Sequence, residues 1–327
     1  MKAVTIDECG AGAWGDAVAC WCASRGIACR RGVVRSGIVP EDEGAVVICK
    51  GAMAAADRMF NPPWAFERVE RLVLIDECPL WQASGHVNGR TALEWDDPIG
   101  VARAMVSHGS WSHASKDWLS PEPERLRSVM LELGLTIKPW KTGEGAALVF
   151  SRNPGGFWYL GGSSDPIRRW IDEDDARMAR AATELCRPVE LRIHPRTSPG
   201  ARSARLLART PPGCSIRPYG ESLIAALSRA SVVDVGAGGS CVLAALEGVP
   251  SVAWAGAERS QIDAGGFSDS KRETLLSVIA AHSVSLSELR GGEYDLFRTR
   301  SSPPRGQRRP PSPGSGNTCP RAQRRSP

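Results

Sequence analysis

The sequence lacks any apolar run that approaches the ~20 residues needed to cross a membrane as a helix. It also shows no signal peptide, because the apolar start at 1–6 is short and is followed at once by Asp7 and Glu8. A chain of 327 residues with 42% hydrophobic residues can bury a large core, and its length suits two domains. We therefore predict a two-domain globular protein of the cytoplasm.

The ten cysteines include no C-x-x-C pair, and several of them stand in apolar stretches. Cys20, Cys22 and Cys29 come nearest to a metal-binding cluster. On a helix, however, Cys20 and Cys22 would face different directions, so their positions favour core packing. The cysteine pattern predicts reduced, buried thiols rather than a disulfide framework or a metal site.

Acidic residues are absent from the segment 298–327, which holds eight arginines among Pro, Ser and Gly. Subtracting these eight from the 41 Lys and Arg residues leaves 33 basic against 36 acidic residues, so the net charge of +5 belongs to the tail. This composition predicts a disordered tail. The tail either binds polyanions weakly and without specificity, by charge alone, or is an appendage with no specific role.

Strand-like and helix-like stretches alternate along most of the chain, which predicts two doubly wound, Rossmann-like α/β domains with parallel sheets that face a cleft. Strands are expected at 2–6, 45–50, 71–76, 146–150, 189–193, 214–218 and 231–235. Helices are expected at 13–25, 52–60, 121–133, 165–186 and 221–230. The segment 77–118 is rich in Trp and His and is interpreted as loops and short elements over the cleft. Turn residues at 134–145 separate a domain at 1–140 from one at 141–297.

The stretch 231–254, SVVDVGAGGSCVLAALEGVPSVAW, combines an apolar strand, a glycine-rich turn, a short helix and a second strand. Such a turn lets backbone N–H groups approach a phosphate at the start of the helix. The dinucleotide fingerprint G-x-G-x-x-G is incomplete here, because Cys241 stands in place of its last glycine. VVDVGAGGS also resembles the first motif of S-adenosylmethionine methyltransferases, with Glu258 as the later acid. Too little chain follows Trp254, however, to complete the sheet of such an enzyme.

The segment 144–297 resembles GT-B glycosyltransferases of the capsule-polysaccharide and bacteriophage-associated kind. The motifs that carry the resemblance are RNPG at 152–155, LRIHPR at 191–196, SLIAALSRASVVDV at 222–235, GGSCVLAALEGVP at 238–250 and SLSELRGGEYDLFR at 285–298. The glycine turn departs from the Asn-Ser or Thr-Ser turn that is common in the family. The N-terminal half resembles the family more loosely, through a strand followed by the NGR loop at 88–90. The resemblance implies a GT-B fold whose second domain holds a nucleotide-sugar donor.

The residue types at the predicted strand ends of the second domain suit a nucleotide diphosphate. His194 and Arg196 follow a strand at the edge where parallel sheets bind ligands, and both can donate to phosphate oxygens. The resemblance implies that Glu247 takes the ribose hydroxyls, as an acid does in GT-B enzymes. The predicted donor-binding residues are Arg152, His194, Arg196, Gly238, Gly239, Ser240 and Glu247.

An apparent D-x-D pair at Asp172 and Asp174 falls within the helix predicted at 165–186. The apolar positions recur there at helical spacing, so the two carboxylates are expected on a solvated helix face. We therefore predict no metal. The charge of the phosphates would be met by Arg, His and backbone N–H groups.

Sugar transfer needs a group that takes the proton of the acceptor hydroxyl. Asp7 and Asp76 end predicted strands on the cleft side, and they are the preferred candidates for this base. Glu8 and His86 are further candidates. With His194 as the group that stabilises the departing diphosphate, Asp7 and Asp76 complete the predicted catalytic set.

These observations predict a metal-independent glycosyltransferase that moves a sugar from a nucleotide-sugar donor to an acceptor glycan or DNA base. Two alternatives stay open. One is an S-adenosylmethionine-dependent methyltransferase that uses VVDVGAGGS, and the other is a non-catalytic nucleotide- or nucleic-acid-binding protein that uses the arginine tail.

Overall fold

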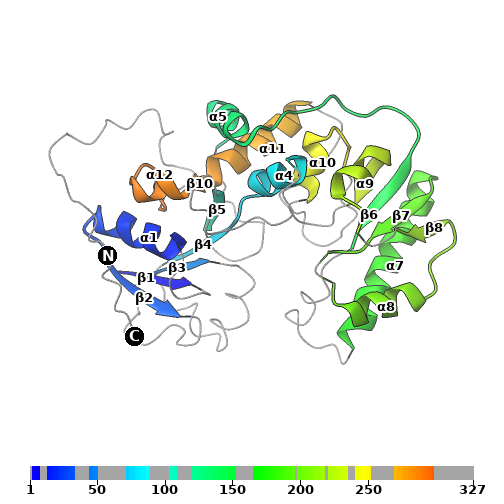
Figure 1. Cartoon of the computed structure of the whole chain (residues 1–327), viewed down its shortest axis with the longest axis horizontal. Helices are drawn as coiled ribbons and strands as arrows, with labels where there is room; N and C mark the ends of the chain where they lie inside the picture. The colour runs from blue at the N-terminus through cyan, green and yellow to red at the C-terminus, as the bar shows by residue number, and fades with distance from the viewer. Residues whose placement is uncertain are drawn as a thin grey trace.

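The computed structural model shows an α/β protein built from two sheets and the helices around them (Figure 1). The structure describes residues 2–7, 13–33, 44–50, 71–88, 103–108, 120–151, 165–195, 197–217, 220–234, 240–251 and 269–297. In this part of the chain, no helix is long and apolar enough to cross a membrane. The helix predicted at 52–60 and the tail at 298–327 lie outside the described residues.

The first sheet has six strands in the order β10-β5-β4-β3-β1-β2. Its strands are β1 (Lys2–Asp7), β2 (Ala28–Val33), β3 (Val46–Lys50), β4 (Arg71–Glu77), β5 (Arg103–His108) and β10 (Ser283–Ser285). Four neighbours, β4, β3, β1 and β2, run parallel, whereas β5 is antiparallel to β4 and β10 is antiparallel to β5. The expected parallel sheet is thus confirmed for four strands, and an antiparallel strand joins it at the β5 side.

The second sheet has four strands in the order β8-β7-β6-β9, and all of them run parallel. The strands are β6 (Ala146–Phe150), β7 (Val189–Arg192), β8 (Cys214–Ile216) and β9 (Ala230–Asp234). Because both faces are covered, β6 is apolar throughout: Leu148 and Phe150 pack into one core and Ala147 and Val149 into another. A parallel bridge from Val233 to Ser251 extends the sheet beyond β9.

Nine helices are found in the described part of the chain. They are α1 (Ala13–Ala23), α4 (Pro79–Val87), α5 (Pro123–Leu133), α7 (Pro166–Leu185), α8 (Pro199–Leu207), α9 (Leu223–Arg229), α10 (Ser240–Leu246), α11 (Asp269–His282) and α12 (Leu286–Arg290). Proline stands in the first turn of α4, α5, α7 and α8, where its missing N–H has no helical partner to lose. The helices predicted at 121–133 and 165–186 are confirmed by α5 and α7.

The last part of the chain returns to the first sheet. Strand β10 pairs with β5, and α12 packs against α1. The buried Arg125 connects α5 to α11 and α12. It donates to the carbonyl of Ala280 in α11 and forms an ion pair with Glu288 in α12. The sequence predicts 141–297 as the second domain, whereas β10 belongs to the first sheet and α12 packs against α1.

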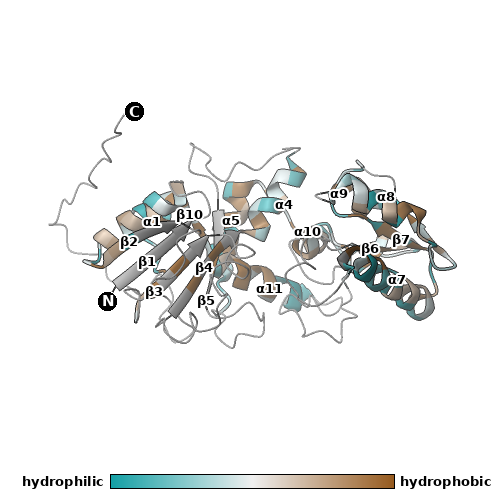
Figure 2. Cartoon of the chain, turned by 90° about the horizontal axis from the view of Figure 1, so that it is seen from below, coloured by the Kyte–Doolittle hydropathy of each residue, from teal (hydrophilic) through white to brown (hydrophobic). Residues whose placement is uncertain are grey.

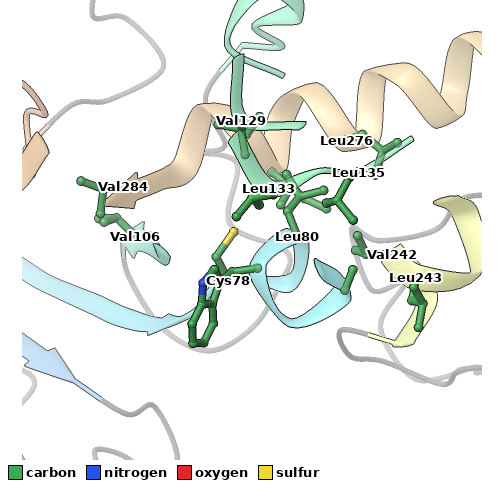
Figure 3. Packing of buried hydrophobic residues seen from close by; sticks show 14 of the residues in the cluster. Cys78, Leu80, Val106, Val129, Leu133, Leu135, Val242, Leu243, Leu276 and Val284 are labelled. Atoms are coloured by element: carbon green, nitrogen blue, oxygen red, sulfur yellow. The ribbon is translucent and has the colours of Figure 1, made fainter. Parts of the chain in front are cut away.

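One apolar core links the two sheets. Helices α4 and α10 contact each other, and α11 lies beside α5 (Figures 1 and 2). Figure 2 shows α11 hydrophilic at its beginning and hydrophobic over its later turns. Figure 3 shows Leu80 of α4 gathered with Leu133 and Leu135, with Val242 and Leu243 of α10 beside them. The two α/β units therefore share a buried interface in which α4 meets the second unit.

The segment 77–118 is predicted as loops and short elements, and its described part contains the nine-residue helix α4 and the six-residue strand β5. The rest of the segment lies outside the described residues. Burial explains the helix, because α4 packs its Trp81 and Leu80 into the core. Cys20 is disulfide-bonded, whereas all ten cysteines were expected to be reduced. Cys22 is a free thiol buried in the core, as predicted.

Candidate functional site

The carboxyl ends of β7, β6 and β9 meet at one edge of the second sheet. Because these strands are parallel, Arg192, Phe150 and Asp234 end them within one residue of the same level, with Phe150 opposite Arg192 and Val149 opposite Asp234. Open parallel sheets bind ligands at this edge. His194 lies two residues beyond the end of β7 and is half-buried.

A tight turn holds the backbone around His194. The carbonyl of His194 accepts a hydrogen bond from the Thr197 N–H at 3.0 Å, and Ser198 then caps α8 by accepting from the Ala201 N–H. Thr197 is 3% exposed, and its hydroxyl has no hydrogen-bond partner. The turn therefore fixes His194 between the strand and the helix, as the sequence predicted for a loop after a strand.

Arg192 is a polar residue of this edge that sequence reasoning did not single out, although it belongs to the LRIHPR motif. Its Nη2 donates to the carbonyl of Glu221 at 2.7 Å. Burial lowers the pKa of Arg192, and the nearby charge of Glu221 opposes this shift. The alternation of β7 offers the signal that could have found it, because Val189 and Leu191 are buried while Glu190 and Arg192 are half-buried.

Helix α4 brings a histidine of the first unit toward this edge. The helix contacts α9 and α10 of the second unit, and its last turn contains His86. Desolvation lowers the pKa of His86, and the positive charge of Arg192 lowers it further. The Asn88 side chain anchors the end of the helix by donating to the carbonyl of Leu133 at 3.4 Å. A neutral imidazole of one unit thus lies near a guanidinium of the other.

The other predicted base candidates are placed only by their backbone. Asp7 ends β1, and Asp76 is the penultimate residue of β4. These strands are separated by β3 and run parallel, so both residues stand at the carboxyl side of the first sheet. Their roles stay predictions. Glu8 lies outside the described residues.

Part of the predicted donor-binding set can be located. Ser240 is the first residue of α10 and is half-buried, while Cys241 directly after it is buried. Four further predicted residues, Arg152, Arg196, Gly238 and Gly239, lie outside the described residues. The strand β9 that leads to the glycine turn is confirmed, and the turn itself stays a prediction.

Glu247 has a protein partner in this structure. It is 8% exposed, and its Oε2 lies 2.6 Å from Nζ of Lys138, a residue of the segment between the two units. The ribose-binding role implied for Glu247 stays a prediction. The contact gives this carboxylate a second interpretation, in which it ties the end of α10 to the connecting segment.

The connecting segment runs along the end of α10 through backbone hydrogen bonds. The N–H of Lys138 donates to the carbonyl of Leu246, and that of Lys141 donates to the carbonyl of Gly248. Gly248 has φ +71, and a Cβ there would stand 1.9 Å from the carbonyl oxygen of Pro139. The glycine of the GVP motif is therefore required by this close approach of two backbones.

The D-x-D pair does not form the solvated face that was expected. Asp172 is exposed, but Asp174 is 1% exposed and accepts a hydrogen bond from the Ser151 hydroxyl at 2.5 Å. Trp170 donates to the same hydroxyl at 2.8 Å. Burial raises the pKa of Asp174 to about 6, and the bond from Ser151 opposes the shift. Asp174 faces inward because this side of α7 packs against β6. Its hydrogen bond with Ser151, the residue directly after β6, connects α7 to the end of that strand.

A second buried acid of this edge is also paired. Arg177 of α7 donates through Nε to Oδ2 of Asp234 at 2.9 Å and through Nη1 to the carbonyl of Phe150 at 2.7 Å. These contacts hold the ends of β6 and β9 together. Within the described ranges, no group of three or more His, Cys, Asp or Glu residues could hold a metal ion.

Comparison with known proteins finds similarity to solved structures only at low sequence identity. No protein-family model and no curated protein matches the chain. Among solved structures, the chain is similar to the KpsC β Kdo 2,4 transferase of Thermosulfurimonas dismutans, with 12% identity, a TM-score of 0.44 and coverage of 85% of this chain and 89% of that chain.

Two further structures cover most of the chain at lower similarity. The UDP-GlcNAc 2-epimerase of Methanocaldococcus jannaschii, in complex with UDP-GlcNAc and UDP, has 10% identity and a TM-score of 0.31, and the match covers 86% of this chain and 92% of that chain. The glycosyltransferase SnogD of Streptomyces nogalater has 11% identity and a TM-score of 0.24, and the match covers 88% and 95% of the two chains.

Proposed function

We propose that the protein is a metal-independent glycosyltransferase that moves a sugar from a nucleotide-sugar donor to an acceptor hydroxyl. The observation that carries the proposal is that α4 of the first unit, whose last turn contains His86, contacts α9 and α10 of the second unit, so that the charge of Arg192 at the end of β7 acts on His86. A group suited to accept a proton thus stands near a cation at the edge where parallel sheets bind ligands.

The donor side rests on polar and positive groups that follow β7 and β6. His194 can donate to phosphate oxygens, and Arg152 and Arg196 are predicted to add charge from the neighbouring loops. When the bond from the anomeric carbon to the phosphate oxygen breaks, the departing nucleotide takes the electron pair and gains negative charge. Cations that are already in place stabilise that charge without reorganisation.

Metal independence is supported by the pairing of the acidic residues. Asp174 accepts from Ser151, and Asp234 is paired with Arg177, so both buried carboxylates at this edge serve the protein's own contacts. The arginine and histidine side chains then meet the charge of the donor. The residues of the second unit thus favour neutralisation of the phosphates by arginine and histidine over neutralisation by a metal ion.

The acceptor side rests on the first unit. The acceptor hydroxyl oxygen forms the new bond to the anomeric carbon, and its proton passes to a base. The lowered pKa keeps His86 neutral near pH 7, so its ring can take this proton. Asp7 and Asp76 are the other candidates for the base, and an acceptor glycan or DNA base is the proposed partner.

A thermal-shift screen of the full chain against UDP, GDP, CMP, their sugar conjugates, S-adenosylmethionine and DNA tests the proposal. A ligand present at about 100 times its Kd stabilises the folded protein by roughly 2.7 kcal/mol. We expect a rise in melting temperature with one nucleotide family and its sugar conjugate. A response to S-adenosylmethionine alone would instead support a methyltransferase, and a response to DNA alone would support a nucleic-acid-binding protein.

A further inference from the structure

We propose that Arg192 and Glu221 form a subsite that binds sugar hydroxyl groups. Nε of Arg192 and Oε2 of Glu221 are both buried, and neither has a hydrogen-bond partner. One is a donor without an acceptor, and the other is an acceptor without a donor. The inference deepens the proposed function, because it names the part of the donor or acceptor that this edge would recognise.

Both side chains are held in place by their remaining atoms. Arg192 donates through Nη2 to the backbone carbonyl of Glu221 at 2.7 Å. Glu221 accepts at its other carboxylate oxygen, Oε1, from Nη2 of Arg229 at 2.5 Å. Each charged group is therefore anchored through one of its atoms, and a second atom of the same group is held in place without a partner. Fixed, unpartnered polar atoms are costly in a protein that has no use for them.

The two unpartnered atoms do not satisfy each other. Although the backbone of Glu221 contacts Arg192, no ion pair between the two side chains is found among the described residues. The charge of Glu221 nevertheless acts on Arg192, because it opposes the lowering of the pKa of Arg192 by burial. The carboxylate is thus near the guanidinium but is oriented so that both groups keep a free bonding position.

The chemistry of the pair selects a hydroxyl over a phosphate. A hydroxyl can accept from Arg192 Nε and donate to Glu221 Oε2, and two neighbouring hydroxyls can divide these roles. A phosphate could accept from the arginine, but its negative charge would be repelled by the carboxylate. Sugar rings carry neighbouring hydroxyls, in the ribose of a nucleotide and in the sugar that is transferred.

The position of the pair agrees with a sugar site. Arg192 ends β7, and Glu221 directly precedes the N-cap of α9, a helix that α4 contacts from the first unit. His86 of α4 lies near Arg192. A hydroxyl held by the pair would therefore lie where the two units meet.

Saturation-transfer NMR on the full chain tests the subsite with simple probes. The probes are methyl α-D-glucopyranoside, methyl β-D-ribofuranoside and inorganic phosphate. We expect transfer to at least one of the two sugars with the wild-type protein. Glu221→Gln should weaken that sugar's binding roughly ten- to a hundredfold, because it replaces a charged acceptor by an amide. The sugar that responds identifies the source of the hydroxyls.

Glu190→Gln is the matched control. Glu190 also lies in the second unit, on β7, but its carboxylate is already paired with Arg217. We expect this variant to bind the sugar as the wild type does. If Glu221→Gln proves unstable, Arg192→Lys offers the second test, since lysine keeps the charge but lacks the Nε donor, and the same loss is expected.

Two results would overturn the inference. One is the absence of transfer to both sugars with the wild type at tens of millimolar, and the other is equal transfer with the wild type and Glu221→Gln. Failure of the nucleotide screen is a separate result. If no nucleotide binds but the sugar signal depends on Glu221, then the subsite stands and the proposed glycosyltransferase function falls.

Discussion

Lys138 Nζ lies 2.6 Å from Oε2 of Glu247, and this ion pair ties the segment between the two units to the end of α10. The Glu247 side chain is 10% exposed, while that of Lys138 is 53% exposed. The acid is thus the buried member of the pair. A residue that the GT-B resemblance connects with ribose therefore has a structural contact of its own.

Glu247→Gln separates these two interpretations. If the carboxylate is structural, then the substitution should lower the free energy of unfolding by about 1–3 kcal/mol, because a charge-assisted bond near the core is lost. Nucleotide affinity should then change little. Chemical denaturation and calorimetric titration with the nucleotide found in the screen measure the two quantities. A loss of affinity with unchanged stability would show that Glu247 contacts the ribose.

His194→Ala and Arg196→Ala should each reduce turnover by a factor of roughly ten to a thousand, as the loss of one preorganised donor does in other enzymes. Both residues follow β7 rather than belong to it, so the melting temperature should hold. Arg180→Ala, on the exposed side of α7, serves as a control that removes one positive charge elsewhere. Full activity in both variants would show that the loop has only a structural role.

The pH profile of activity should report on His86. Its pKa lies below the usual 6.5, so the base is neutral above that range and the rate should fall only as the pH drops below it. Arg192→Met removes a charge that lowers this pKa, and the acid limb of kcat/KM should move to higher pH. His86→Asn should abolish the limb. An unchanged limb in His86→Asn would leave Asp7 or Asp76 as the base.

Acid stability should depend on His282, which is 4% exposed and bonded through Nδ1 to the carbonyl of Val106 at 2.6 Å. Burial lowers its pKa from 6.5 to about 4, so the unfolded chain binds the proton more readily. Stability is therefore lost as the pH falls from about 6.5 to about 4, by roughly 3 kcal/mol.

Asp174 acts in the opposite direction on acidification. Its folded pKa is raised from 3.8 to about 6, so its contribution to stability is present at low pH and is lost as the pH rises through about 6. In His282→Gln, the loss of stability as the pH falls from 7 to 4 should be smaller than in the wild type, because the contribution of His282 is absent while that of Asp174 remains. A variant that still loses stability as steeply as the wild type would contradict the role given to His282.

Truncation after Phe297 should leave folding and nucleotide binding intact. Phe297 packs edge-on against Trp21 with ring centroids 4.9 Å apart, and the Trp21 Nε1 donates to the carbonyl of Tyr294. The cut therefore has to spare Phe297. Loss of the eight arginines should remove weak, salt-sensitive DNA binding. If the truncated protein still bound DNA at moderate salt, then a DNA acceptor would become the better hypothesis.

Local patterns predicted the elements of the second unit well. The strands β6 and β7 are predicted as apolar strands of an alternating α/β pattern, and α7 is predicted from helical spacing. These signals lie within each segment. A strand that is buried on both faces is a continuous apolar run, and a helix that is buried on one face has apolar residues at helical spacing. The order of the elements then determined the α/β class.

The same local information could not predict contacts between distant segments. Residues 283–285 are apolar or small. The spacing of their apolar residues does not indicate whether they pair with β5 or with the second sheet. The sequence predicts Asp174 as a surface acid, because only the packing of α7 on β6 places Ser151 within hydrogen-bond distance of its carboxylate. The antiparallel place of β5 likewise depends on its neighbours and not on its own residues.

In the candidate site, too, local patterns are predicted from the sequence, whereas contacts between distant segments are not. The sequence by itself placed His194 after a strand, because an apolar run followed by polar residues marks a strand end. Only the tertiary structure brought His86 to Arg192 and left Arg192 Nε and Glu221 Oε2 without partners, since these relations join elements from different parts of the chain. Spatial proximity between distant residues is set by how helices and sheets pack, and local spacing does not encode it.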